Sequence, residues 1–123
     1  MMLQVLKSKL HRAKVTDTNL NYEGSLTVPV DLMELAGLLP YEHVLCGNLA
    51  NGARFETYLI PGEPGTGRIV LNGAVAHLGK PGDLLIVMNF AWVDAEQAKN
   101  WKPRVVVLDE NNRPLSVRQA VAS

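Results

Sequence analysis

Apolar and polar residues alternate over much of the first thirty positions, which is the pattern of extended strands. In residues 5–15 the side chains of Lys7, Lys9 and His11 recur at a spacing of two, so a strand would carry all three on one face. Residues 24–30 are rich in threonine and valine and predict a second, shorter strand.

Two short segments carry the start signal of a helix. A capping box pairs the cap side chain with an acid or amide three residues later, and two such pairs are present, Asp31 with Glu34 and Asp94 with Gln97. The first pair predicts a helix over residues 32–36, which Gly37 can end in the left-handed conformation. The second pair predicts a helix of about two turns that reaches residue 101.

Two further strand candidates, residues 42–49 and 54–60, flank an Asn-Gly pair at positions 51 and 52. Asn-Gly is typical of a two-residue type I′ hairpin turn, because both central positions of that turn need a positive φ. Alternation along the second strand sends Arg54, Glu56 and Tyr58 to one face. The other face then receives Phe55, Thr57 and Leu59.

The second half of the chain predicts three more strands. Residues 68–71 form a brief strand, and the Pro81-Gly82 pair has the order of a type II turn. The apolar run at residues 84–93 is typical of a strand buried on both faces. Residues 104–110 predict the last strand, and beyond it we expect a loosely held tail.

These segments together predict a mainly β protein. Six or seven short strands, two short helices and dense turn signals are the pattern of a small β-barrel with helical connections. The chain has 123 residues, the size of one domain, so we expect a single domain over residues 1–123.

Charge and cysteine content narrow the class of protein. The 12 basic and 12 acidic residues give a net charge of zero, which argues against a surface devoted to nucleic acid or to a membrane. No uncharged apolar stretch approaches the ~18–20 residues of a membrane span. The first ten residues lack the order of a secretory signal, and a single cysteine, Cys46, suits a reducing compartment, so we expect a cytoplasmic protein. One cysteine and three unpaired histidines also predict no metal site.

The Gly24-Ser25 pair is the most informative chemistry-bearing feature of the sequence. Gly24 tolerates backbone conformations closed to other residues, so its carbonyl carbon can be held where the Ser25 hydroxyl attacks it. The amide would become an ester, and β-elimination would then split the chain and leave a dehydroalanine that hydrolyses to a pyruvoyl group. A Gly-Ser pair between two strands is also an ordinary turn, so this interpretation depends on the surrounding sequence.

The surrounding sequence supplies that context. The segments KLHRAKVT, NYEGS, NGARFETY and LNGAVAH occur in this order and with these separations. Over residues 3–108 or so, the chain resembles the pyruvoyl-dependent aspartate 1-decarboxylase family. The resemblance implies a six-stranded double-psi β-barrel with short connecting helices, and a homotetramer with active sites between subunits. It also implies a proenzyme that cuts its own Gly24–Ser25 bond into a β chain, residues 1–24, and an α chain, residues 25–123.

The activity implied by the resemblance is decarboxylation of L-aspartate to β-alanine and carbon dioxide, for pantothenate and coenzyme A biosynthesis. The pyruvoyl group made from Ser25 would hold the substrate amine as a Schiff base and serve as the electron sink, the part that pyridoxal phosphate plays elsewhere. Such an enzyme needs neither a metal nor a diffusible cofactor. Self-cleavage is either spontaneous or assisted by a maturation factor, and the sequence leaves both open.

Three residues acquire substrate roles through the resemblance, and each has a simpler alternative. Arg54 would anchor a substrate carboxylate with two parallel hydrogen bonds, or it is an exposed strand arginine. Lys9 would be the second substrate cation, or an edge-strand lysine that prevents aggregation, which is the interpretation we prefer for Lys7. Tyr58 would be the proton donor to the carbanion left by carbon dioxide, or a core tyrosine with a satisfied hydroxyl.

Thr57 is harder to reconcile with these roles. The resemblance implies that it stabilises the oxyanion during self-cleavage and lines the substrate site. Alternation nevertheless points it away from Arg54 and Tyr58. A β-bulge, or the use of opposite faces by different subunits, would remove the conflict.

The remaining site residues match positions near the cleaved bond. His11 and Tyr22 would support processing, or they are a packed histidine and a turn tyrosine. Asn72, Gly73 and Ala74 match the loop that supports the pyruvoyl end and binds substrate, although Asn-Gly is also an ordinary turn.

Two departures from the family pattern bear on the tightness of substrate binding and packing rather than on the type of reaction. Val75 stands where the family usually has alanine, and the segment Leu45-Cys46-Gly47 lacks the polar or aromatic residues often found there. We interpret Cys46 as a small buried hydrophobe.

The competing class is a non-enzymatic, processing-defective β-barrel that binds small acids or a protein partner. The joint presence of Gly24, Ser25, Arg54, Thr57 and Tyr58 favours the enzyme. A nucleic-acid role of the basic N-terminal strand is disfavoured by the zero net charge and the scarcity of aromatic residues.

Overall fold

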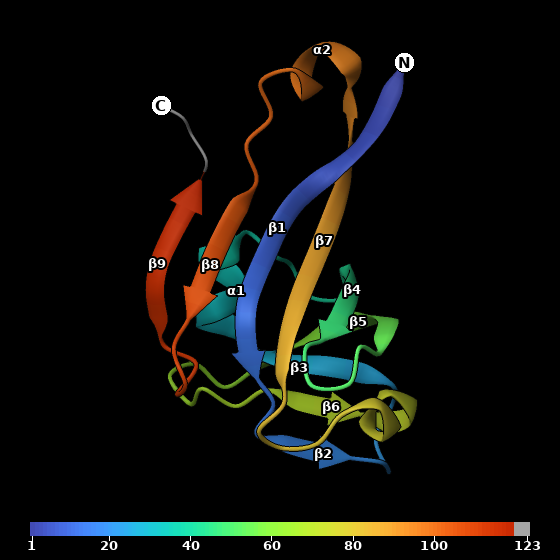
Figure 1. Ribbon diagram of the computed structural model, residues 1–123, viewed down its shortest axis with the longest axis vertical. Helices are drawn as coiled ribbons and strands as arrows, with labels where there is room; N and C mark the ends of the chain where they lie inside the picture. Colours follow the sequence, from blue (N-terminus) through green and yellow to red (C-terminus); the bar gives the residue numbers. More distant parts are fainter. Residues whose placement is uncertain (120–123) are drawn as a thin grey trace.

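The computed structural model describes residues 1–119, which form nine strands, two α-helices and one 3-10 helix (Figure 1). The strands are β1 (Met2–Lys14), β2 (Asp17–Asn19), β3 (Ser25–Pro29), β4 (His43–Asn48), β5 (Arg54–Gly62), β6 (Val70–Asn72), β7 (Leu84–Asp94), β8 (Arg104–Leu108) and β9 (Pro114–Gln119). The helices are α1 (Val30–Ala36), α2 (Ala95–Ala98) and the 3-10 helix η1 (Gly73–Leu78).

The strands form one hydrogen-bonded row in the order β2-β6-β3-β5-β4-β7-β1-β8-β9. Its first strand, β2, directly follows β1 along the chain, and the two residues between them bridge the gap. Val15 N–H donates to Asp83 O at 2.8 Å, and Thr16 N–H donates to Ile69 O at 2.9 Å. The row from β2 to β1 therefore begins and ends on one stretch of chain and closes into a barrel, with β8 and β9 added beyond β1.

The mainly β, barrel-type fold with short connecting helices is thus confirmed, but the expected number of strands is too low. Nine strands are present among the described residues, because β1 and β2 are separate strands and β9 adds to the row. The expectation of a loose tail is wrong for residues 114–119, which pair with β8. A tight turn makes this pairing possible: the Asp109 carboxylate accepts hydrogen bonds from Asn111 N and Arg113 N at 2.8 and 2.9 Å. Residues 120–123, which belong to the expected single domain, lie outside the described residues.

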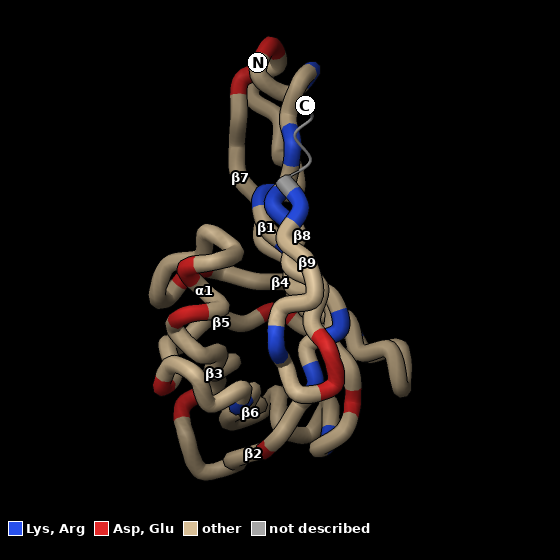
Figure 2. The backbone as a smooth tube through the Cα atoms, turned by 90° about the vertical axis from the view of Figure 1, so that its left-hand side faces the viewer, with Lys and Arg blue, Asp and Glu red and all other residues tan. Residues whose placement is uncertain are grey.

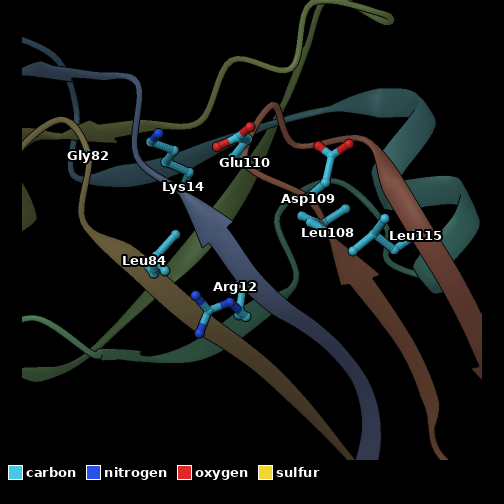
Figure 3. Close-up of a pocket in the computed structure, with 8 residues that line it drawn as sticks. All are labelled: Arg12, Lys14, Gly82, Leu84, Leu108, Asp109, Glu110 and Leu115. Carbon is cyan, nitrogen blue, oxygen red and sulfur yellow. The ribbon is translucent and has the colours of Figure 1, made fainter.

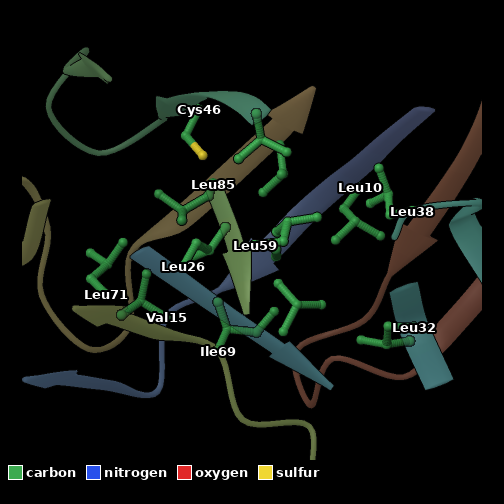
Figure 4. Close-up of a cluster of buried hydrophobic side chains, with 14 of the residues drawn as sticks. Leu10, Val15, Leu26, Leu32, Leu38, Cys46, Leu59, Ile69, Leu71 and Leu85 are labelled. Carbon is green, nitrogen blue, oxygen red and sulfur yellow. The ribbon is translucent and has the colours of Figure 1, made fainter. Parts of the chain in front are cut away.

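The core lies inside the barrel and is built from alternate residues of the strands (Figure 4). Leu10, Leu26, Leu59, Leu71 and Leu85 come from five different strands, and each is fully buried. Because these strands share a single interior, the residues that alternate with the buried ones point to the outside of the barrel.

Strand β1 corrects the expectation that three cationic side chains share a face. Its pairing with β7 shifts between Leu6 and Ser8, so Lys7 sits in a β-bulge. The Lys7 ammonium is turned towards the end of α1, where it donates to Gly37 O at 2.7 Å and to Glu42 Oε1 at 3.1 Å. Only Lys9 and His11 therefore remain on the expected face.

Strand β7 is buried on one face only, and the expectation of two buried faces is wrong. Leu85 and Val87 are buried in the barrel, whereas Phe90 and Trp92 on the other face are 37% and 64% exposed. The reason is visible in Figure 1: β7 and β1 run on beyond the barrel as a two-stranded arm that carries α2.

The helix ends agree with the sequence in part. The capping box of α2, formed by Asp94 and Gln97, is present, although the helix is shorter than expected. Helix α1 begins two residues earlier than a cap at Asp31 would allow, because Pro29 takes the cap position without a side-chain hydrogen bond. Asp31 instead accepts a hydrogen bond from Gly65 N at 3.2 Å. Gly37 ends the helix at φ 74°, as expected.

Of the two predicted turns, one is confirmed and the other is wrong. Asp83 N–H donates to Lys80 O at 3.0 Å and Gly82 has φ 98°, so the type II turn is confirmed. Between β4 and β5, only Gly52 has a positive φ, so the type I′ turn is wrong. A five-residue loop replaces it, because the Asn48 and Asn51 side chains bind backbone N–H groups within the loop.

Candidate active site

Ser25 is the first residue of β3 and is fully buried. Its hydroxyl donates to Glu23 O at 3.0 Å and accepts a hydrogen bond from Asn72 Nδ2 at 3.0 Å. The antiparallel pairing of β3 with β6 sets Ser25 directly opposite Asn72, which explains how residues 47 positions apart meet. The Oγ atom beside the Gly24–Ser25 bond is therefore held from two sides.

The chain around Gly24 is packed tightly against the start of η1. Gly73 has φ 68°, and a Cβ at position 73 would lie 2.6 Å from Gly24 Cα and 2.9 Å from Tyr22 O. No side chain fits there, so glycine at position 73 is what allows residues 22–24 to approach. Ala74 is exposed on η1, and Tyr22, two residues before Gly24, is about half exposed.

The outer face of four adjacent strands carries the other polar candidates. One row of paired residues runs across β5, β4, β7 and β1 as Arg54, Gly47, Ile86 and His11. A second row runs as Glu56, Leu45, Met88 and Lys9. The row between them, Phe55, Cys46, Val87 and Leu10, is buried in the barrel. Arg54, Lys9 and His11 therefore lie together on the outside of the barrel.

Tyr58 connects this outer face to Ser25. The parallel pairing of β3 with β5 sets Leu26 beside Leu59, so the preceding residues, Ser25 and Tyr58, are neighbours on the outer side of the same two strands. The Tyr58 ring also contacts the ring of Tyr41, with centroids 6.2 Å apart. Tyr58 is the predicted site residue nearest to Ser25 along β5.

Thr57 lies on the opposite side of β5 from Arg54 and Tyr58. The pairing of β4 with β5 continues from His43 to Gly47 without a register shift, so alternation is kept throughout this segment. A bulge in this pairing, one of the two explanations considered for Thr57, is therefore absent. The use of opposite faces by different subunits is the explanation that is left.

The cations of the outer face are not direct neighbours of Ser25 in the strand pairing. Lys9 is four strand spacings from β3 along the row, roughly 19 Å at about 4.8 Å per spacing. Arg54 lies four residues from Tyr58, about 13 Å along β5. Its guanidinium reaches towards β4, where a Cβ on Gly47 would be 4.0 Å from Nη1.

Positive charge gathers along β1, β8 and β9 (Figure 2). Burial, together with the charges of Lys9, Arg12 and Arg118, lowers the pKa of His11, which favours its neutral imidazole. Burial raises the pKa of the Cys46 thiol to about 12, so this cysteine is a packing residue rather than a nucleophile.

Two cavities lie on the barrel strands of the described residues, and Ser25 lines neither of them. A cavity of about 270 Å³ lies beside the Arg54 side chain and is floored by Gly47, Ile86 and Met88. A larger one of about 520 Å³ lies near the other end of β1, between Arg12, Lys14 and the turn after β8, and is lined by none of the predicted site residues (Figure 3). Within residues 1–119, no group of three metal-binding side chains is assembled and no helix has the length and apolar character to cross a membrane.

Sequence reasoning missed Thr27 as part of this site. Its Oγ1 accepts a hydrogen bond from Asn72 Nδ2 at 2.8 Å, from the same amide nitrogen that contacts Ser25. The signal in the sequence was the spacing of two between Ser25 and Thr27, which puts both hydroxyls on one side of a strand. Val75, one of the two departures from the family pattern, is buried in the hydrophobic core.

Barrel and site together define a small β-barrel protein with polar candidate side chains on the outside of the barrel and a buried serine at a Gly-Ser bond. The chain belongs to the aspartate decarboxylase family, whose model matches residues 1–115. It is 54% identical to an aspartate 1-decarboxylase of Thermoanaerobacter pseudethanolicus over 113 residues. These residues are 92% of this chain and 97% of the relative.

Two further relatives agree with this assignment. An aspartate 1-decarboxylase of Leptospira biflexa is 55% identical over 115 residues, which are 93% of this chain and 98% of the relative. One from Pelotomaculum thermopropionicum is 52% identical over 122 residues, which are 99% of this chain and 92% of the relative.

Proposed function

We propose that this protein decarboxylates L-aspartate to β-alanine and carbon dioxide, the step that supplies pantothenate biosynthesis, after cutting its own Gly24–Ser25 bond. Membership of the aspartate decarboxylase family, which is pyruvoyl-dependent, supports the reaction and the cofactor. The single observation that carries the cleavage site is the buried Ser25 hydroxyl, held between Glu23 O and Asn72 Nδ2.

The proposed cleavage conserves atoms and electrons in three steps. Ser25 Oγ bonds to the Gly24 carbonyl carbon, the carbon–nitrogen bond breaks, and the hydroxyl proton passes to the freed amine, which leaves an ester. Loss of the Ser25 Cα proton then breaks the Cβ–Oγ bond, and Gly24 departs as a carboxylate. Water hydrolyses the resulting dehydroalanine to a ketone and releases ammonia.

The surroundings of Ser25 fit the small pyruvoyl group that would replace it. Residue 25 is buried, and Asn72 offers an N–H to an oxygen at that position. When present, this group supplies an electron-withdrawing carbonyl to which a substrate amine attaches.

The chain's own side chains provide the remaining functions. Arg54 binds a substrate carboxylate through two parallel hydrogen bonds, and Lys9 adds a second positive charge on the same outer face. Tyr58, the neighbour of Ser25 on β5, gives its hydroxyl proton to the carbon that loses carbon dioxide. Asn72, Gly73 and Ala74 support the reacting end of the chain, and Thr57, His11 and Tyr22 support processing.

An intact mass spectrum of freshly purified protein tests the proposal directly. We expect fragments 1–24 and 25–123, the larger with a ketone in place of its amino group, and conversion of L-aspartate to β-alanine by the same sample. A chain that stays whole on long warming, both alone and with a cell extract that could supply a maturation factor, would contradict the proposal and support a non-enzymatic relative.

We further propose that the enzyme is a homotetramer whose active sites lie between subunits. Lys9 is four strand spacings from β3 along the row, and the Arg54 side chain is directed towards β4, which supports a site completed by a second chain. A neighbouring subunit that lays its Lys9–Arg54 face over Ser25 would bring the two halves together. We expect this assembly in the cytoplasm, which the single buried free thiol of Cys46 suits.

Co-expression of two inactive variants tests the shared site. Ser25→Ala and Arg54→Ala are each expected to lose activity, but a mixed tetramer can combine an intact Ser25 with a neighbour's intact Arg54. At equal expression and random assembly, about one site in four is complete, so the activity should return to roughly a quarter of the wild-type value. Decarboxylation per tetramer is the measurement.

The matched control for that experiment pairs Ser25→Ala with the double variant Ser25→Ala/Arg54→Ala, which contains no intact Ser25. Recovery in the first pair but not in the control supports a site between subunits. Absence of recovery in both, with tetramers formed, would place Ser25 and Arg54 in a site within one chain.

A further inference from the structure

The Asn72 side chain forms a bridge between two hydroxyl groups of β3. Its Nδ2 atom lies 3.0 Å from Ser25 Oγ and 2.8 Å from Thr27 Oγ1. Ser25 and Thr27 are two residues apart and therefore project to the same side of the strand, while Asn72 sits opposite Ser25 on β6. Both N–H groups of the Asn72 side chain are thus hydrogen-bonded to hydroxyl groups of β3.

The network fixes which end of the amide faces Ser25. The single Ser25 hydroxyl proton is already donated to Glu23 O, so Oγ can only accept from Asn72. The group that faces Ser25 must therefore be the NH2 of the amide. Its second proton then points to Thr27 Oγ1, and this contact is the shorter of the two.

Thr27 is itself held in place by the chain opposite. A Cβ on Gly62 would lie 2.9 Å from the Thr27 methyl group, so the absence of a side chain at position 62 leaves room for it. Thr27 also pairs with Ile60 in the parallel ladder between β3 and β5. Its hydroxyl is therefore presented to Asn72 by packing and by main-chain hydrogen bonds.

We propose that Thr27 is a positioning residue for self-cleavage, which holds the Asn72 amide with its N–H directed at Ser25 Oγ. This inference rests on the proposed cleavage of the Gly24–Ser25 bond. In the elimination step Oγ leaves as part of the Gly24 carboxylate and gains negative charge. A hydrogen bond donated to that oxygen becomes stronger in the transition state of the elimination. It therefore accelerates elimination rather than the first attack.

Thr27→Val tests this role, because valine keeps the branched shape and removes the acceptor. Protein made by cell-free synthesis on ice and then warmed gives a defined starting time for cleavage, followed by intact mass. We expect cleavage to slow by roughly three- to tenfold, the effect of one neutral hydrogen bond. The ester should accumulate, and hydroxylamine should convert it to a 25–123 fragment that begins with serine rather than a ketone.

Thr27→Ser is the matched control, since it keeps the hydroxyl and should cleave within about twofold of the wild type. Thr27→Ala replaces the valine variant in the comparison if that variant does not fold. If the wild type cleaves normally and the serine variant cleaves no faster than the variant without a hydroxyl, the role of Thr27 is overturned, but the proposed cleavage is not. A wild-type chain that never cuts would overturn the cleavage proposal itself, and the role of Thr27 with it.

Discussion

Replacement of Ser25 by alanine is expected to leave one uncut chain without decarboxylase activity. Alanine has no oxygen to attack the Gly24 carbonyl carbon and none to leave in the elimination, so neither the break nor the ketone can form. Removal of a covalent participant of this kind typically costs a factor on the order of 10³ or more. Intact mass and the release of carbon dioxide from L-aspartate measure the two losses.

Ser8→Ala is the control for this experiment. Ser8 is also a buried serine on a strand, with its hydroxyl donating to Ala36 O at 2.6 Å, but it lies far from the Gly24–Ser25 bond in the fold. Its loss should reduce stability by about 1 kcal/mol and leave cleavage intact. An alanine variant at position 25 that is cut and active would end the pyruvoyl hypothesis.

Substitution of Gly73 by alanine should have the second-largest effect. The residue has φ 68°, and the new Cβ would lie 2.6 Å from Gly24 Cα, closer than real contacts allow. The positive φ costs about 1 kcal/mol, and relief of the overlap costs about 2 kcal/mol more, so we expect a loss of about 3 kcal/mol in the free energy of unfolding. A shift of Gly24 by about 1 Å should also slow cleavage by roughly a hundredfold.

Gly52→Ala is the control that separates the effect of the steric clash from the effect of the positive φ. Gly52 has a similar φ of 74°, and a Cβ there would meet nothing within 4 Å. Its substitution should cost about 1 kcal/mol and leave the cleavage rate unchanged. Urea unfolding in a Ser25→Ala background measures stability on one uncut chain, and equal losses for the two glycine variants would refute the argument from the contact with Gly24.

The parts of this fold that follow local rules could be predicted from the sequence. Alternation along β5 set Arg54 and Tyr58 on one face and Thr57 on the other, and the unshifted pairing with β4 keeps that arrangement. Gly37 and the capping box at Asp94 depend only on neighbouring residues, so their signals were correct.

The errors arose where a distant contact overrode the local pattern. Lys7 left the expected face because β1 has one residue more than β7 at that point, and nothing within β1 marks this bulge. The Asp31 side chain accepts a hydrogen bond from Gly65 N, 34 residues away, and does not cap its own helix. The bridge from Asn72 to Thr27 depends on the pairing of β3 with β6, which no single segment specifies.

The closure of the barrel through β1 and β2 determines what self-cleavage would leave behind. Both strands precede the Gly24–Ser25 bond, and β1 together with the link after it brings the buried side chains Leu10, Ala13 and Val15 into the core. Fragment 1–24 would therefore remain as an integral, noncovalent component of the barrel rather than diffuse away. Folding of the uncut chain is unimolecular, whereas reassembly after the cut requires two chains to meet. Formation of the barrel itself would thus depend on concentration in the mature protein, whereas in the precursor only the association of subunits would.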